Sequence, residues 1–346
     1  MFFLEYRDPL FSVILFFGII FIITSSSYWW GRYKRSEDNK RLDKFLKQFR
    51  TLPSKKDLNQ HIKKGELPDE SWLLLAHSYF ENGDYEQSIK IYNEMLSFGD
   101  RTSKTELMIL LGKTYFRAGF LERSKEIFLE ILKNKPRTPQ ALHYLLLVYE
   151  NIQDYKQALA VLEPLDELGE DVSKDMDYLK AIELLNNINI LTDEKVEKLL
   201  EIYNKSHQLT YLIFQYIFRV KPEIAWKNLD NSKAYLLSDI FWSLSEKDLD
   251  LDIISKNGYL MELYSARGDI SLVKDSSVFE FNILINLNAK ANVTLGFEYL
   301  CEKCQFTQPF PFHRCINCHS IDTQIVEFSL VKDYKKDIGE EYSSFQ

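Results

Sequence analysis

The sequence is short of glycine, proline and cysteine, and each shortage limits what the chain can be. Only 12 glycines and 9 prolines occur among 346 residues, so a turn-rich all-β fold and long disordered linkers are not expected. All four cysteines lie between Cys301 and Cys318. Thiols that served only as core filler would be scattered along the chain, so this crowding indicates a shared task.

Common motifs of catalysis are also missing from the sequence. It contains no P-loop, G-x-G-x-x-G, H-E-x-x-H or G-x-S-x-G pattern. The six histidines are dispersed, at His61, His77, His143, His207, His313 and His319. We therefore expect a protein that is not an enzyme.

The net charge of −8 is unevenly distributed along the chain. The stretch from Arg32 to Lys64 carries 12 lysines and arginines against 4 acidic residues, whereas the remainder from Gly65 carries 30 against 45. An acidic body argues against general nucleic-acid binding. The 20 tyrosines and 24 phenylalanines are instead typical of a chain that buries large side chains between stacked helices.

The N-terminal segment "LFSVILFFGIIFIITSSSYWW", residues 10–30, contains no charged residue. As a helix it would be about 31 Å long, close to the thickness of the bilayer hydrocarbon core. The basic stretch follows at once and belongs on the cytoplasmic side, which places the body in the cytoplasm. We expect a membrane anchor over residues 1–31 and a basic juxtamembrane helical segment over 32–64. The basic residues could form a solvated helix face, bind anionic lipid, or do both.

The alternative for this segment is a cleaved signal peptide. Its apolar core is signal-like in length, and "TSSS" offers small residues. The positive charge of a signal peptide precedes the apolar core, however, and here it follows, so an uncleaved anchor is favoured.

Three stretches in residues 65–170 align without gaps, at offsets of 36 and 34 residues. The first is "WLLLAHSYFENGDYEQSIKIYNEML", from Trp72. Positions of similar character recur as Ala76, Gly112 and Leu146; as Tyr79, Tyr115 and Tyr149; and as Ser88, Ser124 and Ala158. The apolar spacing predicts paired antiparallel helices that cross closely at the small residues and stack into a solenoid. This pattern resembles the tetratricopeptide repeat.

The inner face of such a solenoid is lined by the first helix of each pair. The positions expected there, and expected to bind a protein, are His77, Phe80, Lys113, Phe116, Arg117, His143 and Glu150. Exposed Phe beside Arg is typical of binding hot spots. Alternatively, Phe80 and Phe116 fill gaps between adjacent repeats.

Residues 171–290 keep helical apolar spacing but lose the repeat register, so we expect degenerate helical repeats. The run "VFEFNILINL" could instead be a strand, because short apolar runs are ambiguous. The fold class is therefore mostly α, with a transmembrane helix, a tetratricopeptide-like α-solenoid and a small β-rich knuckle at the C-terminus.

The cysteines form a C-x2-C-x10-C-x2-C pattern, made of Cys301, Cys304, Cys315 and Cys318. Two C-x2-C turns can direct four thiolates at one metal ion, and strand-like sequences flank them, so we expect a metal-binding domain over 295–332 with a tail over 333–346. Disulfides or unused thiols are the alternatives, and a cytoplasmic body disfavours disulfides. Zinc is favoured over iron, and His313 and His319 are weaker ligand candidates. Gln305 and His319 stand where such knuckles usually carry a left-handed glycine.

The whole architecture resembles the lipopolysaccharide assembly protein B family of Gram-negative bacteria. The most specific pieces are "WWGRYKR" and "YLCEKCQFTQPFPFHRCINCHS". The resemblance implies metal ligation by the four cysteines and a single-pass inner-membrane protein with a periplasmic N-terminus. It further implies a non-enzymatic adaptor that brings the LpxC deacetylase to the FtsH protease and so limits lipopolysaccharide synthesis. This chain is shorter than typical members and its later repeats are weak, so partner surfaces there could differ.

Two other functions remain open at this stage. One is an iron-dependent, rubredoxin-like redox protein that uses the same four cysteines. The other is a scaffold with an unrelated client, including a periplasmic assembly scaffold, which the charge distribution disfavours.

Overall fold

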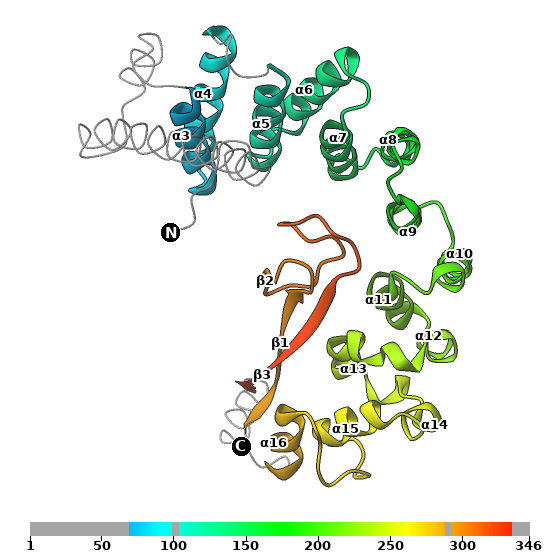
Figure 1. Cartoon of the computed structure of the whole chain (residues 1–346). Helices are drawn as coiled ribbons and strands as arrows, with labels where there is room; N and C mark the ends of the chain where they lie inside the picture. The colour runs from blue at the N-terminus through cyan, green and yellow to red at the C-terminus, as the bar shows by residue number, and fades with distance from the viewer. Residues whose placement is uncertain (1–68, 99–103, 288–291, 334–346) are drawn as a thin grey trace, which may run out of the picture. The chain divides into compact units, whose positions relative to one another are not determined.

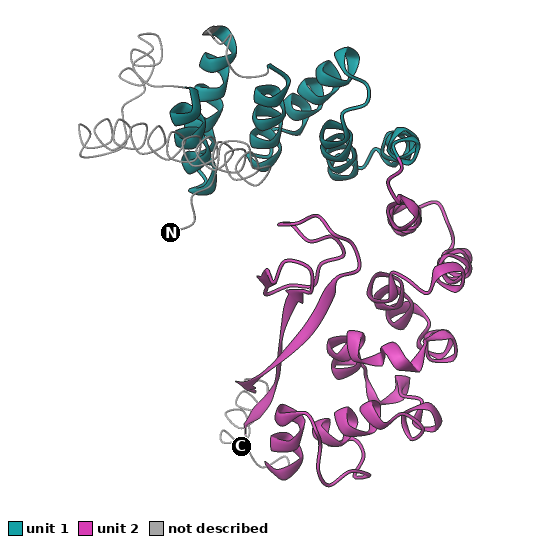
Figure 2. Ribbon diagram, in the orientation of Figure 1, with its two compact units in different colours: residues 1–168 teal, residues 169–346 magenta. Residues whose placement is uncertain are grey.

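A computed structural model describes residues 69–98, 104–287 and 292–333, and the chain divides into two compact units between Leu168 and Gly169 (Figure 2). The expected membrane anchor, the basic segment and most of the tail lie outside the described residues. Among the described residues, no helix combines the length and apolar character needed to cross a bilayer.

The described residues of the first unit form three helical hairpins (Figure 1). They are α3 (Asp69–Glu81) with α4 (Tyr85–Phe98), α5 (Lys104–Arg117) with α6 (Leu121–Asn134), and α7 (Pro139–Asn151) with α8 (Tyr155–Glu167). The same turn joins each pair, with a left-handed residue at Gly83 (φ 78°), Gly119 (φ 80°) and Gln153 (φ 62°). The predicted hairpins and their repeat register are therefore confirmed.

The small residues of the second helices lie where the paired helices cross. Ser88, Ser124 and Ala158 are fully buried. The Ser124 hydroxyl donates a 2.9 Å hydrogen bond to the carbonyl oxygen of Gly112, so a small polar side chain ties the two backbones of the second hairpin together. Larger side chains at these positions would force the helices apart.

Gly112→Ala is expected to destabilise the first unit by about 1–2 kcal/mol, although alanine is the better helix former. A Cβ atom at this position would lie 2.7 Å from the ring of Phe128, which is itself fully buried. Chemical denaturation measures the change. Gly258→Ala is the matched control, because no atom lies within 4 Å of its added Cβ. Equal stabilities of the two variants would contradict the tight crossing.

The second unit begins with a regular hairpin and continues with shorter helices. The hairpin is α9 (Ser173–Asn186) with α10 (Thr192–Ser206), as its sequence predicts. The helices that follow are α11 (Thr210–Val220), α12 (Pro222–Asn228), η1 (Asn231–Leu237), α13 (Ser238–Ser243), η2 (Glu246–Asp248), α14 (Leu251–Ile254), α15 (Gly258–Arg267) and α16 (Phe279–Leu287).

A proline separates the two helices of the run "TYLIFQYIFRVKPEIAWKNL", whose sequence predicts a helical hairpin. Pro222 lacks the N–H that a continuous helix would need and its ring would clash with the preceding turn, so α11 ends at Val220 and α12 starts at Pro222. The strand alternative for "VFEFNILINL" is wrong, since this run forms α16 and buries Phe281 and Leu284.

A three-stranded antiparallel sheet completes the second unit, in the order β2-β1-β3. Its strands are β1 (Val293–Cys301), β2 (Thr307–Gln308) and β3 (Gln324–Lys332). The long pair β1–β3 runs from Val293 opposite Lys332 to Cys301 opposite Gln324, so it carries the cysteine region at one end. In the middle of this pair, the Phe328 ring of β3, opposite Phe297, packs with its centre 5.1 Å from that of Phe281 of α16.

Candidate metal centre and partner-binding face

The four cysteines belong to two matching turns. In the first turn the amide of Gln305 donates to the carbonyl oxygen of Cys301 at 2.8 Å, and in the second His319 donates to Cys315 at 2.9 Å. Gln305 (φ 60°) and His319 (φ 59°) adopt the left-handed conformation expected at these positions. Side chains other than glycine are strained there, so another interaction has to hold the turns in place.

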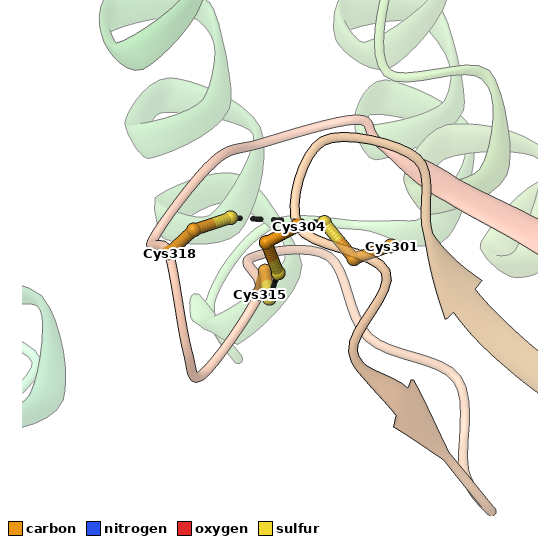
Figure 3. Close-up of side chains that lie close together, drawn as sticks. All are labelled: Cys301, Cys304, Cys315 and Cys318. Atoms are coloured by element: carbon orange, nitrogen blue, oxygen red, sulfur yellow. Dashed lines mark hydrogen bonds between the residues drawn. The ribbon is translucent and has the colours of Figure 1, made fainter.

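The turns bring the four sulfur atoms together, within 4.8 Å of one another, and Figure 3 shows the side chains converging. The Sγ atoms of Cys301 and Cys318 are 3.7 Å apart, and those of Cys304 and Cys315 are 3.6 Å apart. A tetrahedral ion with metal–sulfur bonds of about 2.3 Å requires sulfur separations of about 3.8 Å. All four cysteines are unpaired, and the separations far exceed an S–S bond of about 2.05 Å, which rules out disulfides in this structure.

Hydrogen-bond donors surround the sulfur atoms and favour thiolates. Burial raises the pKa of Cys301, but the Thr323 hydroxyl and the backbone N–H of Cys304 outweigh burial and lower it to about 6. The Ser320 hydroxyl lies 2.8 Å from the sulfur of Cys318 and lowers the pKa of that thiol despite its burial.

Cys315 behaves differently from these two cysteines. Its burial raises the pKa of the thiol to about 12, although the backbone N–H groups of Cys318 and Asn317 favour the thiolate. Four thiolates in contact repel one another unless a cation compensates them. The donor set and the geometry therefore fit one divalent or trivalent metal ion with a closed shell of four cysteines.

Neither candidate histidine belongs to this cluster of ligand atoms. The ring of His313 instead packs 6.0 Å from that of Tyr211, and burial lowers its pKa to about 4. His319 occupies the left-handed turn position. Both findings agree with a ligand set made of cysteines alone.

The knuckle, residues 301–323, is attached to the helices of its own unit by partly buried polar contacts. The carboxylate of Asp322 accepts a 3.0 Å hydrogen bond from the amide of Leu209, next to α11. The guanidinium of Arg314 bonds to Asp175 of α9 at 3.0 Å and lies 4.9 Å from the ring centre of Tyr178. The sequence analysis missed these residues, since the partners are 113 and 139 positions apart and no local pattern marks them.

A third contact joins the sheet to the helices. Asp239 of α13 accepts hydrogen bonds from Tyr211 of α11 at 2.5 Å and from Tyr299 of β1 at 2.8 Å. Burial, together with the carboxylate, raises the pKa of both tyrosines, so the two hydroxyl groups remain protonated donors. One carboxylate thus links the strand that leads into Cys301 to two helices.

The expected partner-binding residues fall into two groups in the structure. His77, Arg117 and His143 are exposed, whereas Phe80, Lys113, Phe116 and Glu150 are half-buried. Phe80 packs edge-on against Tyr85 of its own hairpin at 5.7 Å. Phe116 packs edge-on against Tyr144 of the next hairpin at 5.9 Å, so gap filling between repeats describes Phe116 better than a wholly free ring.

Comparisons with known proteins agree with the repeat assignment. A tetratricopeptide-repeat model matches residues 69–98, which are α3 and α4. None of the curated protein sequences compared with this chain matches it.

Solved structures show some similarity to this chain as well. The MamA RS-1 ArsTM double mutant is 16% identical, with 46% of this chain and 89% of the other covered and a TM-score of 0.36. MamA MSR-1 C2 is 17% identical, with 45% and 90% covered and a TM-score of 0.33. A thermophilic TPR protein from Thermus thermophilus is 14% identical, with 56% and 99% covered and a TM-score of 0.31. TM-scores this low support no argument about partners.

The repeat assignment therefore stands on the family match to the first hairpin and on the identical register of the next two. The cluster of four sulfur atoms stands on the geometry above. Within its described residues, the chain is a tetratricopeptide-repeat protein with a C-terminal four-cysteine cluster.

Proposed function

We propose that this protein is a non-enzymatic adaptor, anchored in the bacterial inner membrane, whose repeats bind a client protein in the cytoplasm. The observation that carries the proposal is the set of three hairpins in one register, because stacked repeats of this kind present an extended surface for protein partners. The uncharged segment at residues 10–30 and the basic residues that follow support the anchor and its orientation.

The metal in this proposal is a single zinc ion with a structural role. Four cysteine ligands leave no coordination position open for a substrate, which is typical of structural rather than catalytic zinc sites. When bound, the ion would stabilise the two left-handed turns and hold Asp322 and Arg314 in reach of the helices. An iron ion would have the same four cysteine ligands. Colour and a reversible redox signal of the purified protein would identify iron in place of zinc.

The client in this proposal is LpxC, and the protease to which it is delivered is FtsH. The support is the order of an N-terminal apolar segment, repeats and a terminal four-cysteine knuckle, which resembles the lipopolysaccharide assembly protein B family. A scaffold with an unrelated client is the alternative.

Depletion of the protein should raise LpxC abundance several-fold, because the deacetylase would no longer be delivered for degradation. Deleting residues 1–30 should have the same effect, since the client would be captured away from the membrane. Immunoblotting of LpxC in both strains, with re-expression of the full chain as the control, measures the result. Unchanged LpxC levels in both strains would rule out this client and leave an adaptor with another one.

A further inference from the structure

A hollow of about 740 Å³ lies in the second unit, between α15, α16 and the start of β1 (Figure 1). Its lining offers apolar surface that the described residues cover only in part. Leu287 is exposed there, and the half-buried members of the lining are Ile270, Val273, Ile285 and Val293. Hollows of about 300–1,000 Å³ with apolar walls are typical of binding sites.

Hydrogen bonds hold the walls of this hollow in place. The guanidinium of Arg267 donates through Nη1 to three backbone carbonyl oxygens at the end of α13, which lie 2.7–3.0 Å away. The indole N–H of Trp242 in α13 donates to the hydroxyl of Thr294 in β1 at 3.3 Å. The hollow is therefore built before an occupant arrives, which lowers the cost of binding.

One polar group in the hollow lacks a hydrogen bond. Ser265 of α15 lines the hollow and is 8% exposed, and its Oγ atom has no hydrogen-bond partner among the described residues. Buried hydroxyl groups in native structures nearly always have a partner. A backbone carbonyl or amide of an occupant would supply one, which favours a peptide segment over a wholly apolar ligand.

The chain leaves its described part at this hollow. Asp333 lines it, and the amide of Asp333 donates a 3.0 Å hydrogen bond to the carbonyl oxygen of Asn292, next to the last pair of β1 and β3. Residues 334–346, "YKKDIGEEYSSFQ", follow. Ile338 is five positions beyond Asp333, and five extended residues span up to about 17 Å, so the segment can enter a hollow that the chain already borders.

The charges of the hollow and of this segment are complementary. Lys274 is exposed at the edge of the hollow and forms no ion pair with a carboxylate of the described residues. Ile338 has acidic residues on both sides, which are Asp337, Glu340 and Glu341. A segment that places Ile338 on the apolar wall thus brings carboxylates toward Lys274, and this attraction helps to fix its register.

We propose that the hollow binds the chain's own C-terminal segment, residues 334–346. Ile338 packs against Leu287, the backbone beside it bonds to the Ser265 hydroxyl, and a following glutamate pairs with Lys274. The bound segment fastens one end of the β1–β3 pair to α15 and α16, while the other end of the pair carries the four cysteines. This site belongs to the second unit and does not depend on the client proposed above.

Photo-crosslinking of the purified full chain in mild detergent tests this. An aliphatic diazirine amino acid replaces Ile338, and the linked peptides are identified by mass spectrometry. We expect links within one chain to the lining of the hollow, in residues 265–274, 284–287 and 293–294. A mixture of isotope-labelled and unlabelled chains distinguishes links within one chain from links between two.

Leu287→Asp should lower the yield of these links about fivefold or more, because it places a carboxylate on the apolar wall beside an acidic segment. Leu287 is 39% exposed, so the variant should fold. Lys274→Glu should also lower the yield, and added salt should reduce the difference from the wild type.

The matched control is Leu272→Asp, at a leucine that is 61% exposed and does not line the hollow, and it should leave the yield unchanged. Three results would overturn the proposal. They are the absence of links to the hollow, links that form mainly between two chains, and equal losses of yield in the Leu272 and Leu287 variants.

Discussion

Cys315→Ser is expected to abolish stoichiometric metal binding and to unfold the knuckle. Cys315 is fully buried, and its sulfur lies 3.6 Å from that of Cys304 at the centre of the cluster. A serine hydroxyl is a poor ligand for a metal that selects thiolates, and metal binding contributes about 10–16 kcal/mol to the folding of comparable small zinc sites. Elemental analysis should show about one metal ion per wild-type chain and a small fraction of that in the variant.

The loss should remain local to the second unit. Hydrogen exchange of residues 301–323 and of the first turn of α11 should become fast, because Asp322 would no longer hold the amide of Leu209. The six helices from α3 to α8 should keep their protection, since they form a separate compact unit. Ile316→Ser, at an exposed neighbour that is not a ligand, is the matched control and should keep its metal. Full metal occupancy in Cys315→Ser would contradict the four-cysteine site.

Asp239→Ala should destabilise the second unit by about 3 kcal/mol or more. The variant removes two hydrogen bonds to a charged acceptor, each worth about 1.5 kcal/mol or more. The hydroxyls of Tyr211 and Tyr299 then lose the carboxylate that accepts from them. Asp239→Asn should cost less, because it keeps an oxygen acceptor. Chemical denaturation followed by the signal of the second unit measures both.

Two further variants distinguish loss of the hydrogen bonds to Asp239 from a general effect of removing a negative charge. Tyr299→Phe should reproduce part of the loss, whereas Asp252→Ala, at an exposed position of α14, should have little effect. Metal occupancy should stay near the wild-type value in Asp239→Ala, because none of these groups is a ligand. A change below about 1 kcal/mol in Asp239→Ala would show that the carboxylate does not carry the attachment of β1 to the helices.

Local patterns in the sequence predicted the parts of the fold that depend on local spacing. The register of Ser88, Ser124 and Ala158 predicted the helix crossings, since a helix places residues on one face at fixed intervals. The two C-x2-C pairs predicted the sulfur cluster, and their neighbours Gln305 and His319 predicted the left-handed turns. Each of these features needs only residues that are close in the chain, or a simple repeat.

Features that depend on distant residues could not be predicted in this way. In the sequence, Arg314 is indistinguishable from other basic residues, and only the fold places Asp175 of α9 beside it. In the same way, no local pattern around Asp239 indicates that two tyrosines donate hydrogen bonds to it. Helical periodicity places Phe116 on the inner face, and the sequence left open whether it contacts a partner or fills a gap between adjacent repeats. Its contact with Tyr144 depends on how the next hairpin stacks, which periodicity alone does not determine.

The central claim is that the inner face of the repeats captures the client, and site-specific photo-crosslinking in living cells tests it most directly. A photo-reactive amino acid replaces the exposed Arg117 of α5 in one strain and Lys90 of α4 in another. Adducts in the membrane fraction are identified by mass spectrometry. The account predicts an adduct with LpxC from position 117 and none from position 90. No adduct at position 117, or equal adducts at both positions, would contradict it.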